Sequence, residues 1–296
     1  MKNQQPKSKV NTDSERDFML MIATGKKRVG KTYRTAREVE SYRMNDPRSG
    51  RKGMKVLIFD IQQEPEWSKY PTINYDVDEP DELKRASEII KFTQSEIVEV
   101  RRLVPVRKNR QQMTADQMVS VVQTINKYYR RGMLILEDIN RIITSKNQDE
   151  IIDALISTRH IQQDIVMHLQ SLAGVTPRMF QNVEMIRFHK QSDPIDRYKN
   201  RIPMFSLMKI AEITVDRNYR NGNERYFVYV SPTEEKIYGL SFDQFKESCL
   251  EYLSRYESDL RPYLKQIDPK SGKKKYTSFE QAAEAWINDH LYFWDN

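Results

Sequence analysis

Cysteine is nearly absent from this sequence, which has a single one, Cys249, among 296 residues. One cysteine cannot close an intramolecular disulfide, and it leaves no cysteine cluster for a structural zinc ion. The four histidines show no spacing that is typical of metal ligands. The sequence therefore predicts a protein of a reducing compartment that has no zinc site.

Long apolar stretches are missing as well. The longest one near the start, Phe18–Ala23, is followed by a basic segment with glycines. A membrane-spanning helix needs about 20 apolar residues, and a signal peptide needs an apolar stretch of about 7–15. We therefore expect no membrane span and no secretion signal, and a soluble protein inside the cell.

Charged residues, by contrast, are abundant. They make up 31% of the sequence, against about 25% in an average protein. The 49 Lys and Arg residues outnumber the 42 Asp and Glu residues, and the resulting charge of +7 suits a polyanionic partner without requiring one. The length and the 38% of hydrophobic residues allow a substantial core in one large or two modest domains.

Short apolar runs alternate with helix-like segments over the first two thirds of the chain. Residues 1–16 are polar and are expected to form a flexible arm. Strands are predicted at Phe18–Thr24, Lys55–Asp60, Glu96–Val106, Met133–Leu136, Asp164–Gln170 and Val183–His189, and helices at Thr32–Met44, Thr114–Gly132 and Asp149–Arg159. Such alternation is typical of a parallel sheet, so an α/β domain is predicted over residues 17–200.

The pattern changes after about Lys199. Turn signals separate the segments here, and the chain is predicted to form strands at Lys209–Val215, Glu224–Val230 and Glu235–Tyr238 and helices at Phe242–Tyr256 and Ser278–Trp294. Residues 201–296 are therefore expected to form a smaller α+β region.

The segment after the first predicted strand has the pattern G-x-x-x-x-G-K-[ST]. Its residues are Gly25, Lys26, Lys27, Arg28, Val29, Gly30, Lys31 and Thr32. Glycines let backbone N–H groups surround phosphate oxygens, and the helix start adds partial positive charge. Lys31 is expected to reach the β- and γ-phosphates, and the Thr32 hydroxyl to ligate Mg²⁺. A surface turn is the alternative, but the strand before the segment and the helix after it favour a phosphate loop.

Two carboxylates, Glu137 and Asp138, directly follow the apolar strand Met133–Leu136. Open α/β sheets bind ligands at the carboxyl ends of their strands, so we expect these side chains near the phosphate loop. One carboxylate would hold Mg²⁺ and the other would polarise the attacking water. An ordinary acidic strand end is the alternative, and the phosphate loop argues against it.

The order of these segments resembles the FtsK–HerA superfamily of P-loop ATPases. The resemblance covers about Phe18–Lys190 and includes the phosphate loop and the segments KVLIFDIQQEP, MLILEDINR and TRHIQQDIVMHLQS. More narrowly, the chain is similar to viral DNA-packaging ATPases and to Zot-like proteins of filamentous phages. The resemblance implies that Arg159 is an arginine finger and Gln170 a sensor of the γ-phosphate. Asp60 and Glu64 match acidic positions more weakly.

The resemblance also implies a fold, ligands and partners. The fold is a RecA-like P-loop NTPase core, with a mainly parallel sheet flanked by helices. The implied activity is an ATPase that uses ATP and Mg²⁺ to translocate DNA, as in viral genome packaging. The implied partners are double-stranded DNA without sequence preference, other subunits in a hexameric ring, and a viral capsid or vertex protein. The expected location is the host cytoplasm or the virion.

The acidic pair departs from the superfamily pattern at both positions: Asp usually precedes Glu, but here Glu137 precedes Asp138. By family order Glu137 holds the metal together with Thr32, and Asp138 is catalytic with a shorter reach to water. Two alternatives remain open. A Zot-like ATPase of phage assembly, secretion or conjugation is disfavoured by the missing membrane segment. A nucleotide-gated scaffold with weak turnover is disfavoured by Arg159 and Gln170.

Clusters of basic residues offer contacts for DNA phosphates. They lie at Arg101–Arg102, Arg107–Arg110, Lys127–Arg131 and Lys273–Lys275. Each cluster alone is equally well explained as solvated surface charge, but we expect at least one to bind DNA without reading its sequence. Nothing in the sequence resembles a helix-turn-helix or zinc-finger motif for base recognition.

Overall fold

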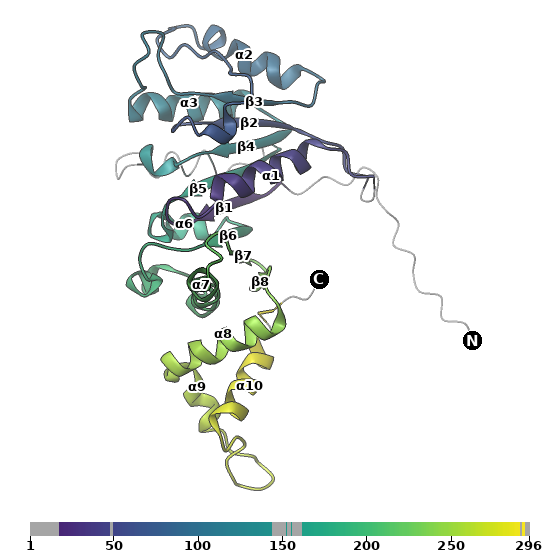
Figure 1. Ribbon diagram of the computed structural model, residues 1–296, viewed down its shortest axis with the longest axis vertical. Helices are drawn as coiled ribbons and strands as arrows, with labels where there is room; N and C mark the ends of the chain where they lie inside the picture. Colours follow the sequence, from purple (N-terminus) through teal and green to yellow (C-terminus); the bar gives the residue numbers. More distant parts are fainter. Residues whose placement is uncertain are drawn as a thin grey trace, which may run out of the picture.

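The computed structural model describes residues 18–47, 50–143, 152, 155, 162–290 and 292–293. Within these ranges one sheet has the strand order β3-β2-β4-β5-β1-β6-β7-β8 (Figure 1). The strands are β1 (Leu20–Thr24), β2 (Lys55–Phe59), β3 (Val100–Leu103), β4 (Gly132–Leu136), β5 (Gln163–Leu169), β6 (Met185–His189), β7 (Phe227–Ser231) and β8 (Lys236–Tyr238). The helices are α1 (Lys31–Arg43), α2 (Glu82–Gln94), α3 (Ala115–Tyr128), α6 (Pro177–Phe180), α7 (Phe205–Arg220), α8 (Phe242–Arg255), α9 (Glu257–Leu264) and α10 (Phe279–His290).

The strands β1 to β6 run parallel to one another. β1 lies between β5 and β6, and β4 lies between β2 and β5. Every residue of β1, β2, β4 and β5 is buried, as expected for parallel strands that are covered on both faces. β7 and β8 continue the sheet beyond β6 in antiparallel pairing. The predicted α/β fold with a mainly parallel sheet flanked by helices is confirmed.

Two apolar layers cover the two faces of this sheet. On one face, Val39 of α1 and Trp67 of the short 3-10 helix η1 (Pro65–Trp67) pack against strand residues such as Ile58. On the other face, the helices α2, α3 and α7 contribute to a larger core. Because parallel strands point the same way, the loops that follow β1, β4 and β5 meet at one edge of the sheet.

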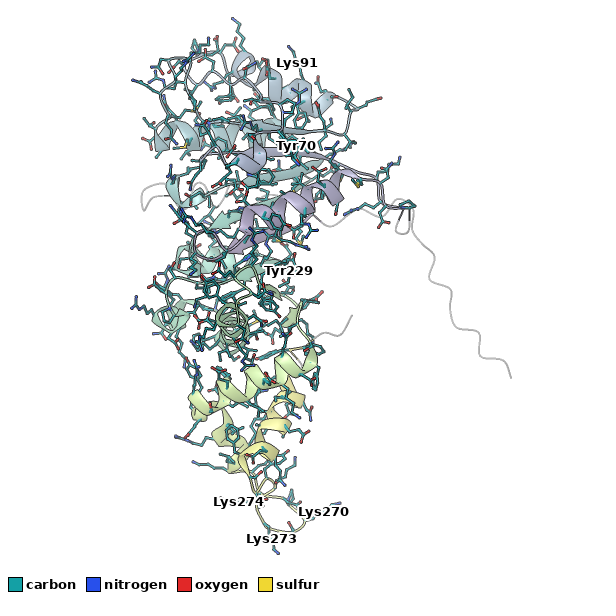
Figure 2. All side chains as sticks on the ribbon, in the orientation of Figure 1. Tyr70, Lys91, Tyr229, Lys270, Lys273 and Lys274 are labelled. Carbon is teal, nitrogen blue, oxygen red and sulfur yellow. The ribbon has the colours of Figure 1, made fainter. Side chains whose placement is uncertain are left out.

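The last part of the chain extends the molecule at one end. The helices α8, α9 and α10 lie together beyond β8, and the loop between α9 and α10 forms the tip (Figure 1). Lys270, Lys273 and Lys274 project from this tip (Figure 2). The sheet continues from β6 into β7 and β8, and the proposed domain boundary near residue 200 stays a prediction. In the described part of the chain, no helix has the length and apolar character needed to cross a membrane.

Most predicted strands are confirmed with small shifts of their ends, but the strand predicted at Lys209–Val215 is wrong. This segment lies in the middle of α7. Its β-branched residues favour a strand, yet every residue from Leu207 to Val215 is buried, so no polar face reveals the helical period. The ammonium group of Lys209 is paired inside the fold with Glu212 and Asp196.

The predicted helices are largely confirmed. Thr114 caps α3 through a reciprocal pair of hydrogen bonds with Gln117, and Ser241 caps α8 in the same way with Gln244. The helix predicted at Asp149–Arg159 falls mostly outside the described residues, as does the arm at 1–16. The sequence does not predict α2, a charged helix of 13 residues, or α9, which has only 8 residues.

Candidate active site

The segment Gly25–Thr32 connects β1 to α1 in a tight loop, as predicted. Gly30 has a φ of 85° and precedes the first residue of α1. Gly25 lies so close to β6 that a Cβ atom there would be 2.7 Å from the Cβ atom of His189. Gly30 is therefore required by its backbone conformation, and Gly25 by the close approach of a neighbouring strand.

Backbone hydrogen bonds fix the loop to both neighbours of β1. The Gly25 N–H donates to the carbonyl of Leu169 on β5 (3.2 Å), and the Lys26 N–H donates to the carbonyl of Lys190 after β6 (2.8 Å). Among the described residues, no side chain caps the start of α1, and the first turn of α1 contains no acidic residue. The exposed N–H groups and the partial positive charge of this helix start favour a bound anion, and phosphate fits both.

The ammonium group of Lys31 lies inside the loop. It donates hydrogen bonds to the carbonyl oxygens of Gly25 (2.5 Å) and Lys26 (2.8 Å). Burial lowers the pKa of Lys31 from 10.5 to about 8, although the carboxylates of Glu137 and Asp138 act to raise it. Phosphate at the loop would restore the charged form, because a nearby negative charge stabilises an ammonium ion.

Glu137 follows β4 and is held by two neighbours. Its Oε1 atom accepts a hydrogen bond from Nε1 of Trp67 (2.8 Å), and its Oε2 atom is 2.8 Å from Nδ1 of His168 on β5. Burial would raise the pKa of Glu137, but the interactions with His168 and Trp67 outweigh it and lower this pKa. Glu137 is therefore an ionised carboxylate with a fixed orientation.

His168 links Glu137 to the helix that follows the phosphate loop. A carboxylate only accepts hydrogen bonds, so Nδ1 of His168 donates to Glu137, and Nε2 of His168 lies 2.8 Å from the hydroxyl of Thr35 on α1. The Thr35 hydroxyl in turn accepts a hydrogen bond from the buried guanidinium of Arg187. Arg187 also donates to the Lys31 carbonyl (3.2 Å) and pairs with Glu38. These buried contacts join β4, β5, β6 and α1.

The same network reaches β7 through a tyrosine. Tyr229 donates a hydrogen bond from its hydroxyl to Oε1 of Glu38 (2.5 Å) and lies where β7 faces α1 (Figure 2). Charge and hydrogen bonds from Arg187 and Tyr229 lower the pKa of Glu38, although burial alone would raise it. The start of α1 is thus fixed by charge pairs as well as by the apolar layer.

Asp138 occupies the position after Glu137 and has a φ of 47°. Its carboxylate accepts hydrogen bonds from the amide of Gln170 (2.8 and 3.0 Å) and from the amide of Gln62, and it lies 3.4 Å from the guanidinium of Arg141. This backbone turn points Glu137 and Asp138 in different directions. Asp138 therefore faces the two glutamine amides, whereas Glu137 faces Trp67 and His168.

A cavity of about 430 Å³ brings the predicted site residues together. Those that line it are Lys27, Arg28, Gly30, Lys31, Thr32, Glu137, Asp138 and Gln170. Of the other predicted residues, Gly25 and Val29 shape the loop, and Lys26 donates to the Tyr219 hydroxyl (2.8 Å) beside a neighbouring hollow. Arg159 lies outside the described residues, so its role as an arginine finger stays a prediction.

Two residues that line this cavity, Thr32 and Glu137, carry oxygens of the kind that bind Mg²⁺. Within the described residues, no group of three or more His, Cys, Asp or Glu side chains is arranged to hold a metal. Mg²⁺ bound with a nucleotide needs only one or two protein oxygens, because phosphates and water supply the others. Thr32 and the ionised Glu137 line the cavity and would hold the ion, which would neutralise charge on the phosphate groups.

Several residues of the cavity are not predicted from the sequence. The cavity is also lined by four residues that no motif marks: His168, Gln62, Tyr33 and Arg225. Glu64 lines it too, in agreement with its weak match to an acidic position of the superfamily. The strand DIVMHLQ contained a signal for His168, because a polar residue within an apolar parallel strand needs a buried partner. No motif marks Arg225, which precedes β7.

Asp60, the acidic residue directly after β2, does not line the cavity as Glu64 does. Asp60 is fully buried, accepts a hydrogen bond from the Glu64 N–H (3.0 Å) and lies 3.5 Å from the guanidinium of Arg102. Burial raises the pKa of Asp60. Asp60 therefore orders the loop that carries Gln62 and Glu64 and does not line the cavity.

No family model and no curated protein matches this sequence. Among solved structures, the chain is similar to the genome packaging NTPase B204 from Sulfolobus turreted icosahedral virus 2 in complex with ATP-gammaS. The two chains are 14% identical, the match covers 76% of this chain and 97% of that chain, and the TM-score is 0.48.

A second similar structure is the N-terminal domain of zonular occludens toxin from Neisseria meningitidis. It is 14% identical, the match covers 63% of this chain and 92% of that chain, and the TM-score is 0.35. A viral packaging NTPase and a Zot domain are also the kinds of protein that the sequence resembles.

Proposed function

We propose that this chain binds ATP with Mg²⁺ and hydrolyses it. The observation that carries the proposal is a single cavity, lined on one side by the phosphate loop and on the other by Glu137, Asp138 and Gln170. A surface turn would not enclose a lysine, and an ordinary strand end would not place two carboxylates opposite it. The combination is typical of phosphoryl transfer to water.

The contacts of each residue support a distinct role. Lys31 changes its hydrogen bonds from loop carbonyls to the β- and γ-phosphates, and Thr32 and Glu137 hold the metal. Asp138, held by Gln170 and Gln62, orients the attacking water and takes up its proton, while Gln170 contacts the γ-phosphate. Arg159 is proposed to act on the site of the next subunit in a ring.

We further propose that hydrolysis drives DNA translocation in viral genome packaging. The sequence resemblance and the net charge of +7 support a DNA partner. The cluster at Arg107–Arg110 is less suited to this role than expected, because Arg107 is paired with Asp78 and Lys108 with Asp76. The lysines at the tip of the loop between α9 and α10 have no ion pair with any described residue and are better candidates.

Replacing Lys31 by alanine should abolish hydrolysis and leave the fold intact, because this lysine neutralises phosphate charge and contributes little to the core. Lys27→Ala is the matched control: Lys27 belongs to the same loop but is exposed, so its loss should reduce the rate less than tenfold. Phosphate release and circular dichroism measure the two effects. Wild-type turnover by the folded Lys31→Ala variant would contradict the assignment of the loop.

Glu137→Gln and Asp138→Asn should impair different steps, nucleotide binding and hydrolysis respectively, although each removes one negative charge. Glu137→Gln should weaken binding of Mg²⁺ with ATP, because it removes a metal ligand. Asp138→Asn should bind ATP normally and hydrolyse it about 10²–10⁴-fold more slowly, since it loses a general base. Nucleotide titrations and single-turnover rates distinguish the two, and the opposite pattern would reverse the roles.

Double-stranded DNA should bind without sequence preference and should stimulate hydrolysis. The variant with Lys270, Lys273 and Lys274 replaced by alanine should lose salt-dependent affinity, with a slope of log K against log salt that is shallower by about 2–3. Arg107→Ala with Lys108→Ala is the control, because both charges are already paired. An unchanged slope in the triple variant excludes the tip as the DNA-binding surface. Absence of binding at low salt excludes DNA as the partner.

A further inference from the structure

Two exposed side chains, Tyr33 and Arg225, line the same cavity as Glu137 and Asp138. Tyr33 follows Thr32 directly and is 44% exposed, and Arg225 comes from the loop between α7 and β7. The Arg225 guanidinium lies over the Tyr33 ring, 4.7 Å from its centroid. Its aliphatic stem covers Gly30, where a Cβ atom would be 3.2 Å from Cγ of Arg225.

The strand order separates the two ends of the cavity. Glu137 and Asp138 follow β4 and Gln170 follows β5, which lie on one side of β1. Arg225 precedes β7, which lies beyond β6 on the other side of β1. The phosphate loop lies between them. A nucleotide with its terminal phosphate at the carboxylates therefore has its base at the Tyr33–Arg225 end.

We propose that Tyr33 and Arg225 form the subsite for the base of the nucleotide. This inference rests on the proposed binding of ATP at the phosphate loop. The base stacks against this pair, because an aromatic ring and a guanidinium both interact with aromatic π systems. Both side chains are exposed and already in contact with each other, so little reorganisation is needed when the base binds.

A base subsite explains these contacts better than a further phosphate contact. The Arg225 guanidinium lies 4.7 Å from the centroid of an aromatic ring, a contact of the kind that it would also make with a base, whereas phosphate is usually bound through the edge of a guanidinium. The subsite reads the face of the base and not its hydrogen-bonding edge. ATP and GTP should therefore bind within about threefold of each other, and the smaller pyrimidine of CTP should bind more weakly.

The test compares ATP with inorganic tripolyphosphate, which has the phosphates without a base. In the full-length protein, Tyr33→Ala and Arg225→Ala should each weaken ATP binding about tenfold and leave tripolyphosphate binding within twofold of wild type. Tyr33→Phe retains the ring and should bind ATP as wild type does. Arg37→Ala is the matched control: this arginine also lies over the Tyr33 ring, at 5.7 Å, but does not line the cavity.

The outcomes separate the inference from the proposed function. Equal losses of ATP and tripolyphosphate binding in Arg225→Ala would show a phosphate contact and overturn the base subsite. Unchanged ATP binding in both alanine variants would also overturn it. If wild type binds neither ATP nor tripolyphosphate, the proposed function fails, and the base subsite fails with it.

Discussion

The enclosed ammonium group of Lys31 is the feature on which the rest of the site depends. It is partly buried at the edge of the cavity, and its hydrogen bonds go to two carbonyls of its own loop. A buried cation is costly without a charged partner, and the carboxylates of Glu137 and Asp138 offset only part of that cost. The loop is therefore arranged for a ligand that brings negative charge, and the sheet places that ligand beside the two carboxylates.

The two sides of the cavity are held in register by buried hydrogen bonds as well as by the sheet. His168 connects Glu137 to Thr35, and Arg187 connects Thr35 to Glu38 and to the Lys31 carbonyl. Glu137, the proposed metal ligand, is thus linked through hydrogen bonds to the helix that begins at the phosphate loop. Removing one member of such a network destabilises the folded site, because the remaining buried groups lose their hydrogen-bond partners.

The sequence predicted the local parts of the site and missed those that depend on tertiary packing. The phosphate loop and the acidic pair have their chemistry within a few consecutive residues, so spacing alone identifies them. Arg225 reaches Tyr33 only because β7 joins the sheet beside β6, and no local pattern contains that contact. The strand predicted at Lys209–Val215 failed for a related reason, since burial on all sides hides the helical period.

Burial lowers the pKa of Lys31 to about 8, and a bound nucleotide should stabilise its charged form. Calorimetry of ATP binding in two buffers of different ionisation enthalpy measures the resulting proton uptake directly. Above the pKa of about 8, binding should take up close to one proton and weaken as pH rises, because the nucleotide favours the charged ammonium form. Lys31→Arg should take up none. Wild-type binding at pH 9 with no proton uptake, and with the affinity found at pH 7.5, would contradict the account.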